Sequence, residues 1–320
     1  MYHLEKYNGK STRYRCPQCN ENKQFTKYVN NETGEYLADF VGICNRINSC
    51  GYHYSPMQYF QDNPTRKYHF EKTDQIKIAN KSIIPPSYIP TEYTSKSVQL
   101  THDGSTNNFI HYIRNLIGSD KTKDIISQFN IGTSMQFPGA TIFWQIDMDR
   151  KVRTGKIIQY DPITGKRNKE ISNHIRWVHS LLKKSKSVNT YCLQQCLFGL
   201  HQLFTAPIDK SIGIVESEKT AIIASIYLPE LIWLATGGIQ NLSSQMLAPI
   251  ASRKIVLFPD LNGYDLWKEK SYKIQKDLSV NIVISDLLER KAAKTDLSKG
   301  FDIADYLILC YSSKAQVSLK

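Results

Sequence analysis

The sequence lacks any long apolar segment. No part of its 320 residues approaches the roughly 18 consecutive apolar residues needed to cross a membrane. The N-terminal stretch MYHLEKYNGK also lacks the apolar centre of a secretory signal. Both absences predict a soluble protein of the cytoplasm. A hydrophobic fraction of 41% excludes a disordered chain, and the length is sufficient for two or three domains.

A phosphate-binding loop is also missing. The segment NGKST resembles the end of such a loop, but Leu4 stands where the first glycine is required, and no strand is predicted before it. The chain is therefore not expected to contain a nucleotide-driven motor of its own.

Negative charge is scarce in the first two-thirds of the chain. Residues 1–210 contain 28 Lys and Arg against 17 Asp and Glu, whereas residues 211–320 contain 13 against 12. The formal net charge of the whole chain is +12. This asymmetry favours a polyanionic partner such as nucleic acid for residues 1–210, although an ordinary basic surface would have the same composition.

Four of the seven cysteines lie in the first 50 residues, which indicates metal binding more than disulfides in a reducing cytoplasm. Cys16 and Cys19 form a Cys-x-x-Cys pair, and a segment with a turn at NNETGE leads to Cys44 and Cys50. A hairpin there would join both pairs into a structural zinc site, a zinc ribbon. Because five residues separate the second pair, His53 is an alternative ligand. Buried thiols without a metal are the alternative to the whole site.

Composition divides the chain into four predicted segments. Residues 1–60 carry the cysteine cluster, and residues 61–95, with four prolines and no sustained periodicity, are predicted to be a linker. Residues 96–210 combine two short helices with a pair of strands in a basic α+β module. Residues 211–320 alternate the aliphatic runs SIGIV, LIWLA, KIVLF and NIVIS with three helical stretches, which predicts a parallel sheet covered on both faces. The predicted fold class is therefore α+β and multidomain, with an α/β C-terminal domain.

Acidic residues follow the ends of the predicted strands. Glu216 follows SIGIV, Asp260 follows KIVLF, and Asp302 precedes the final helix. Because the carboxyl ends of parallel strands share one edge of a sheet, these acids are expected to converge and to hold Mg²⁺ or Mn²⁺. A site of this kind suits phosphoryl transfer. The alternative is that each acid only caps a helix or occupies its first turn.

The segments GIVESEKTAIIAS, LATGG, VLFPDLNG and FDIADYL resemble the TOPRIM domain of primases, topoisomerases and related nucleases. The resemblance implies that Glu216 and Asp260 are the catalytic acids, that Asp302 assists them in holding the metal, and that Asp302 and Asp305 match an acidic tail of primases. Asn262 stands where the family has the second acid of an Asp-x-Asp pair. It is a further candidate ligand, because an amide keeps an acceptor oxygen but loses the charge.

A zinc ribbon followed by a basic module and a TOPRIM domain resembles the order in bacterial-type DNA primases, and most closely the primase-like proteins of mobile genetic elements. This resemblance implies RNA primer synthesis by a nucleotidyltransferase, with single-stranded DNA and NTPs as ligands and a separate helicase or replication initiator as partner. Lys219 is a candidate phosphate contact or a solvated helix residue. The candidate contacts to the nucleic-acid backbone are Arg153, Lys156, Lys166, Arg167, Lys169 and Arg176.

Two other functions are compatible with these patterns. The departure at Asn262 favours a non-catalytic TOPRIM protein that binds nucleic acid in replication or mobilisation. A TOPRIM nuclease would use the same acids. Cleavage of the topoisomerase type would also need a tyrosine nucleophile, and no pattern selects one among the 19 tyrosines.

Overall fold

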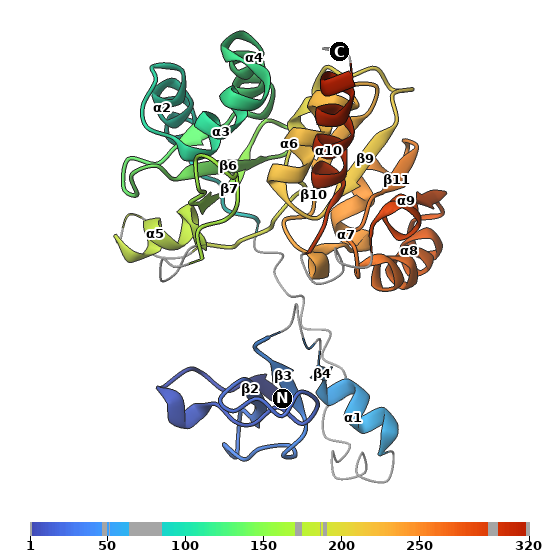
Figure 1. The fold of residues 1–320 in the computed structure, drawn as a ribbon. Helices are drawn as coiled ribbons and strands as arrows, with labels where there is room; N and C mark the ends of the chain where they lie inside the picture. Colours follow the sequence, from blue (N-terminus) through green and yellow to red (C-terminus); the bar gives the residue numbers. More distant parts are fainter. Residues whose placement is uncertain are drawn as a thin grey trace. The chain divides into compact units, whose positions relative to one another are not determined.

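A computed structural model describes residues 2–46, 50, 52–63, 85–169, 175–185, 187, 191–293 and 300–317. The chain divides into two compact units, Met1–Ser82 and Ile83–Lys320 (Figure 1). Among the described residues, no helix combines the length and the apolar character that a membrane span requires.

The first unit is built on a small antiparallel sheet. Its strands are β1 (Tyr2–Leu4), β2 (Phe25–Asn30), β3 (Gly42–Cys44) and β4 (His53–Tyr54), paired in that order, with a 3₁₀ turn η1 (Lys10–Thr12). The predicted hairpin is present, because the chain turns after Asn30 and Tyr36 pairs back with Val29. A short helix, α1 (Pro56–Asp62), follows, and Ser55 and Gln58 cap it reciprocally.

The second unit begins with three helices and an antiparallel sheet. The helices are α2 (Thr91–His102), α3 (Asn108–Ile117) and α4 (Ser119–Phe129). The sheet pairs β5 (Gly132–Thr133), β6 (Thr141–Ile146), β7 (Val152–Ile158) and β8 (Ile175–Trp177) in that order, and α5 (Val178–Lys184) and the 3₁₀ turn η3 (Leu200–Phe204) follow. Asn107 caps α3, because its side chain accepts a hydrogen bond from the amide of Ile110.

Helix α2 has no counterpart in the sequence prediction, and it begins inside the segment predicted as a linker. Its buried face is made of hydroxyl residues, Thr94, Ser97 and Thr101. Ser97 accepts a hydrogen bond from the indole of Trp144 at 2.9 Å, and Thr101 pairs with Thr133 at 2.8 Å. A search for apolar periodicity misses a helix whose buried face is polar.

The chain ends in a parallel sheet of order β10-β9-β11-β12. Its strands are β9 (Ile212–Val215), β10 (Ile232–Ala235), β11 (Ile255–Leu257) and β12 (Ile282–Ile284), and they match the four predicted aliphatic runs. The connecting elements are α6 (Glu218–Tyr227), η4 (Ile239–Asn241), α7 (Ser244–Leu247), η5 (Ala248–Ile250), α8 (Tyr264–Leu278), α9 (Leu287–Lys291) and α10 (Ile303–Val317).

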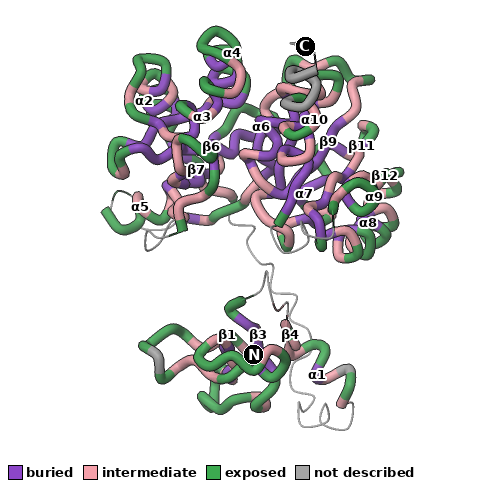
Figure 2. Tube along the Cα trace, in the orientation of Figure 1, coloured by how far each residue is buried: buried purple, intermediate pink, exposed green. Residues whose placement is uncertain are grey.

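Both faces of this sheet are covered, as predicted. Val215 and Ala235 belong to an apolar cluster with residues of α6 and α10, whereas Ile212 and Ile214 belong to a second cluster with residues of α7 and α8. Strands β9 and β10 are therefore buried along their length (Figure 2), which explains their continuous apolar composition. In β12, Val283 is exposed.

One apolar core joins the basic module to the parallel sheet. Phe109 of α3 and Phe143 of β6 share a buried cluster with Val215 and Trp233, and Phe198 pairs with Ala235 through backbone hydrogen bonds. The segments before and after residue 210 therefore belong to one unit, while the domain boundaries drawn from the sequence stay predictions. The predicted fold class is confirmed as mixed α and β, with an N-terminal ribbon and a C-terminal parallel sheet.

Candidate functional site

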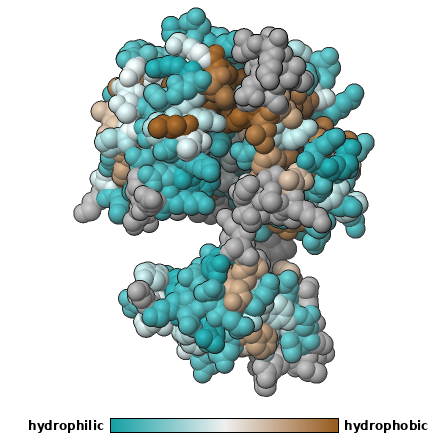
Figure 3. Space-filling model, in the orientation of Figure 1, coloured by the Kyte–Doolittle hydropathy of each residue, from teal (hydrophilic) through white to brown (hydrophobic). Residues whose placement is uncertain are grey.

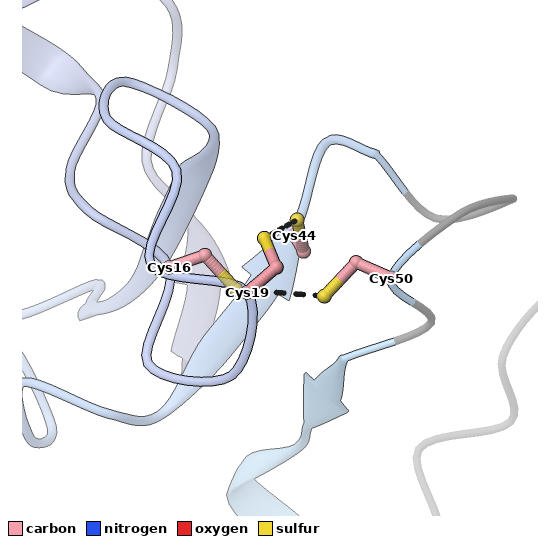
Figure 4. Close-up of side chains that lie close together, drawn as sticks. All are labelled: Cys16, Cys19, Cys44 and Cys50. Atoms are coloured by element: carbon pink, nitrogen blue, oxygen red, sulfur yellow. Dashed lines mark hydrogen bonds between the residues drawn. The ribbon is translucent and has the colours of Figure 1, made fainter.

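The four N-terminal cysteines converge on one point (Figure 4). The Sγ atoms of Cys16 and Cys50 lie 3.7 Å apart, those of Cys19 and Cys44 lie 3.9 Å apart, and all four lie within 4.8 Å of one another. Sulfurs bound to one tetrahedral zinc at 2.3 Å are about 3.8 Å apart. The thiols therefore fit a zinc ion with no open coordination position, which is the arrangement of a structural site.

The pKa values of the clustered thiols favour a bound cation. Although burial raises it, the pKa of the Cys16 thiol is lowered to about 7, because the amides of Cys19 and Gln18 donate hydrogen bonds to it. Burial raises the pKa of Cys44 to about 12. Without a metal the four thiols cannot all ionise together at neutral pH, whereas a bound zinc deprotonates its ligands.

His53 lies outside this cluster. Its Nε2 lies 3.0 Å from the hydroxyl of Tyr28, the two rings stack, and the four atoms that converge all come from cysteines. Of the two alternatives left open by the sequence, the structure therefore brings Cys50, and not His53, to the metal position.

Replacing Cys16 by Ala is expected to reduce the zinc content from about one ion per chain to near zero and to unfold the ribbon, because the few buried side chains around Phe25 cannot hold it alone. Zinc analysis of the purified chain and circular dichroism measure both effects. Cys192→Ala, outside the cluster, is the control and should keep its zinc. Unchanged zinc in the Cys16 variant would exclude the site.

Glu216 and Asp260 occupy the carboxyl ends of the two central strands of the parallel sheet. Glu216 directly follows β9, and Asp260 follows β11 after Phe258 and Pro259. Because β9 and β11 are hydrogen-bonded neighbours, these acids meet at one edge, and the Asp260 amide donates a hydrogen bond to the Glu216 carboxylate. The convergence expected from the sequence is therefore present for this pair.

Each of these two carboxylates has a buried oxygen without a hydrogen-bond partner, Oε1 of Glu216 and Oδ1 of Asp260. Burial raises the pKa of Glu216 to about 7, assisted by the negative charge of Asp302. Burial and the neighbouring Glu216 and Asp302 also raise the pKa of Asp260 well above its usual range. Unpaired buried carboxylate oxygens are costly in isolation, and a divalent cation would satisfy them.

Asp302 and Asp305 have a structural role at the start of α10. Asp302 accepts a hydrogen bond from the Asp305 amide at 2.9 Å, and Asp305 accepts one from the Asp302 amide at 3.3 Å. The second Asp302 oxygen accepts a hydrogen bond from Thr220 at 2.6 Å. The helix-cap alternative therefore applies to Asp302, which contributes its charge to the Glu216–Asp260 pair while both of its oxygens are already engaged.

Asn262 lies in a tight turn between Asp260 and Gly263. The Gly263 amide donates to the Asp260 carbonyl at 2.7 Å, and Asn262 adopts a left-handed backbone with φ of 77°. Asparagine tolerates this conformation better than most side chains. The side chain is exposed, so the turn itself gives a reason for an amide at this position.

Gly263 is required by the carboxylate beside it. A Cβ at this position would lie 2.9 Å from Oε1 of Glu216 and 3.0 Å from the Asp260 carbonyl oxygen, and its φ of −96° is an ordinary one. The absence of a side chain therefore leaves room for the Glu216 carboxylate.

Basic side chains surround the acids. Lys219 donates to the carbonyl of Gly165 at 3.1 Å, which holds the turn before Lys166 and Arg167 against α6. The charges of Lys219 and Lys166 lower the pKa of Asp305, although burial and Asp302 raise it overall, and Arg167 acts on Asp260 in the same way. Three residues predicted to contact phosphate therefore act electrostatically on acids of this edge, Lys219 and Lys166 on Asp305 and Arg167 on Asp260.

Lys156 differs from the prediction. Only 6% of its side chain is exposed. The ammonium donates hydrogen bonds to Glu218 at 3.1 Å and to the carbonyl oxygen of Gly237 at 2.9 Å. It therefore contacts Glu218 instead of lying open to a nucleic-acid backbone. Glu218, with 1% of its side chain exposed, had no signal in the sequence, where it reads as an ordinary first-turn acid.

The remaining predicted basic residues are spread over the module. Arg153 is paired with Asp147 at 2.7 Å, Arg176 stacks on the ring of Phe137, and Lys169 is exposed. The aromatic residues Phe143, Trp144 and Tyr160 of this module are buried in the core and are not open to stack on bases. Nucleic-acid contacts by this set stay a prediction.

The acids do not form a compact ligand set by themselves. Within the described part of the chain, only the four cysteines form a group of at least three His, Cys, Asp or Glu side chains whose ligand atoms all lie within 4.8 Å of one another. Mg²⁺ suits this edge because it keeps several waters and commonly binds through one or two carboxylates. Glu216 and Asp260 fit that requirement, since each offers a buried oxygen without a partner.

Two family models match parts of the chain. Residues 1–65 match a zinc beta-ribbon finger, over the segment in which the four thiols meet. The N-terminal unit is a zinc ribbon. Residues 107–261 match a domain of unknown function, DUF6371, which includes both Glu216 and Asp260. No curated protein matches the chain.

Solved structures of primases are similar to the chain. The primase fragment of the bacteriophage T7 primase-helicase protein is 8% identical, with a TM-score of 0.32, and the match covers 85% of this chain and 88% of that chain. The Escherichia coli primase catalytic core is 14% identical, with a TM-score of 0.32 and coverage of 71% and 79%. The zinc-binding and RNA polymerase domains of the Aquifex aeolicus primase are 13% identical, with a TM-score of 0.37 and coverage of 96% and 80%.

These comparisons return primases, the class that the sequence resembles. TM-scores below 0.5 do not establish a shared fold, however, so the evidence for function has to come from the side chains of this chain.

Proposed function

We propose that this chain is a primase-like nucleotidyltransferase that binds single-stranded DNA and uses Mg²⁺ or Mn²⁺ at the Glu216–Asp260 edge to synthesise short RNA primers. The observation that supports this proposal most is the pair of buried carboxylate oxygens without partners at the ends of two adjacent parallel strands. No hydrogen-bond donor among the described residues contacts these two oxygens, and a hydrated divalent cation would bind both.

In this proposal Glu216 and Asp260 hold the cation, and Asp302 adds negative charge without giving up its contacts to Thr220 and Asp305. When bound, the cation neutralises phosphate oxygens during transfer. Arg167, beside Asp260, and Lys219 would bind the phosphates of the incoming NTP. Exposed Asn262 would supply at most a neutral oxygen, which favours a site centred on one tightly held ion.

The zinc ribbon is proposed to bind the DNA strand. Its surface combines exposed aromatic rings with basic side chains, and the guanidinium of Arg13 lies over the exposed ring of Tyr7. Aromatic rings beside basic side chains suit single-stranded nucleic acid, because bases stack on the rings and phosphates pair with the cations. Much of the face drawn in Figure 3 is hydrophilic, in keeping with a charged ligand.

The test is a primer-synthesis assay with single-stranded DNA templates, labelled NTPs and Mg²⁺ or Mn²⁺. Short labelled RNA products are expected from the wild type and from Glu230→Gln, an exposed control, but not from Glu216→Gln. Template cleavage that depends on Glu216 would support a nuclease instead. DNA binding without either product would support the non-catalytic alternative.

Replacing Gly263 by Ala is expected to weaken binding of Mn²⁺ by at least about tenfold, the usual effect of disturbing a residue that orients a metal ligand. The added methyl group would lie 2.9 Å from Oε1 of Glu216 and displace that carboxylate. Titration calorimetry measures the affinity, and thermal unfolding checks that the variant stays folded. Equal Mn²⁺ affinity in a folded variant would contradict the proposed role of Glu216.

A further inference from the structure

A cavity of about 600 Å³ lies in the second unit. Ile232, the first residue of β10, lines it, whereas Glu216 and Asp260 follow the last residues of the neighbouring strands. Because β10, β9 and β11 are parallel, the cavity and the carboxylates lie at opposite edges of the sheet. Arg150 and Lys210 line the cavity, and none of its lining residues is acidic, so the site is suited to an anion.

The N-terminus of α2 contributes to this cavity. Thr91, Thr94 and Ser95, from the first turns of this 12-residue helix, line it, and the N-cap is Pro90, which offers no capping side chain. The first amides and the positive end of the helix dipole therefore favour a phosphate here. Independently, Thr94 is 7% exposed, and its Oγ1 is buried without a hydrogen-bond partner. A buried hydroxyl of this kind indicates a missing ligand.

Arg150 occupies an unusual backbone position beside the cavity. Its φ of 61° lies in the left-handed region, which glycine adopts at lower cost. The guanidinium carbon lies 4.0 Å from the centre of the Phe204 ring, and this stacking fixes the charge at the cavity wall. The strained backbone is therefore combined with a positioned cation.

His201 contributes a ring nitrogen to the lining of the cavity. Its Nε2 lies 3.0 Å from the carbonyl oxygen of Gln128 and 2.9 Å from the side-chain nitrogen of Asn130, and its Nδ1 is buried without a hydrogen-bond partner. Burial lowers the pKa of His201. A polar group of a ligand would satisfy Nδ1.

We propose that this cavity is a second nucleotide site, which binds a free phosphorylated nucleoside without a divalent cation. The phosphate contacts the N-terminus of α2, Arg150 and Lys210, and a polar group of the base faces Nδ1 of His201. A volume of about 600 Å³ is much larger than a phosphate and falls within the range of small-ligand pockets. The site is separate from the carboxylate edge of the proposed function.

The test is titration calorimetry of the full chain with GTP and with ATP in the absence of divalent cations. Arg150→Gly removes the guanidinium and suits the left-handed backbone, and Lys210→Ala removes the second cation. Each is expected to weaken nucleotide binding by at least about tenfold, the effect of losing one charge-assisted hydrogen bond. Lys184→Ala, which removes an exposed lysine of α5, should bind as the wild type does. Hydrogen exchange should show protection of residues 91–95 on addition of GTP.

Several results would overturn this inference. One is that the chain binds no nucleotide without metal. Another is that Arg150→Gly and Lys210→Ala leave nucleotide binding unchanged. Binding of a 5′-phosphorylated oligonucleotide but not of GTP or ATP would also overturn it, because the source of the phosphate would then be a strand. The primer-synthesis assay is read separately, so failure here does not decide the proposed function.

Discussion

Glu216→Gln is expected to stabilise the metal-free chain at alkaline pH while it removes activity. Burial raises the pKa of Glu216 from its ordinary 4.5 to about 7, so the folded chain keeps a proton that the unfolded chain has lost. The favourable contribution of this group is complete below pH 4.5 and is lost as the pH rises to about 7. Glutamine does not titrate, so the variant keeps its stability where the wild type loses it.

The unfolding free energy of Glu216→Gln should exceed that of the wild type by almost nothing at pH 4.5 and by on the order of 3 kcal/mol at pH 8. This value corresponds to the rise in the pKa of Glu216. Thermal and urea unfolding of the zinc-loaded chain from pH 4.5 to pH 8, without added Mg²⁺ or Mn²⁺, measure the difference. Glu230→Gln, which removes an exposed carboxylate, should follow the wild type. A Glu216→Gln chain that is less stable than the wild type at pH 8 would contradict this account.

Lys156→Met is expected to destabilise the second unit by about 3–5 kcal/mol, because it leaves the buried Glu218 carboxylate without its cation. The carbonyl of Gly237 would lose its donor as well. Urea unfolding followed by circular dichroism measures the change. The double variant Lys156→Met with Glu218→Gln removes both charges and should recover much of the lost stability. Most of the loss in the single variant comes from the Glu218 charge that stays buried without its partner.

The matched control is Lys169→Met, which removes an exposed lysine of the same module and should change the unfolding free energy by less than about 0.5 kcal/mol. If Lys156→Met had an equally small effect, or if the double variant were no more stable than the single one, the Lys156–Glu218 contact would not stabilise the unit.

The sequence predicted the parallel sheet well because its signal is local. SIGIV, LIWLA, KIVLF and NIVIS are short runs rich in aliphatic residues, and the strands of the first two are buried at every position. The acids at the ends of the runs follow from the direction of the strands. The same locality explains the cysteine set, since a short hairpin brings both pairs together.

Contacts between distant segments could not be predicted in this way. The Lys156–Glu218 pair joins residues 62 positions apart, and it depends on how the antiparallel sheet packs on α6. Lys156 reads in the sequence as one basic residue among many. The sequence did not predict helix α2 for another reason, because its buried face consists of hydroxyl residues and has no apolar periodicity. Asp302 shows that two roles can coexist, because it caps α10 and also lies near Glu216.

The most direct measurement is equilibrium binding of Mn²⁺, followed by electron paramagnetic resonance, to the zinc-loaded chain at pH 8. The account predicts one bound Mn²⁺ per wild-type chain, an affinity reduced by at least about tenfold in both Glu216→Gln and Asp260→Asn, and no change in Glu230→Gln. Equal Mn²⁺ affinity in all four proteins would contradict the claim that Glu216 and Asp260 together hold a divalent cation.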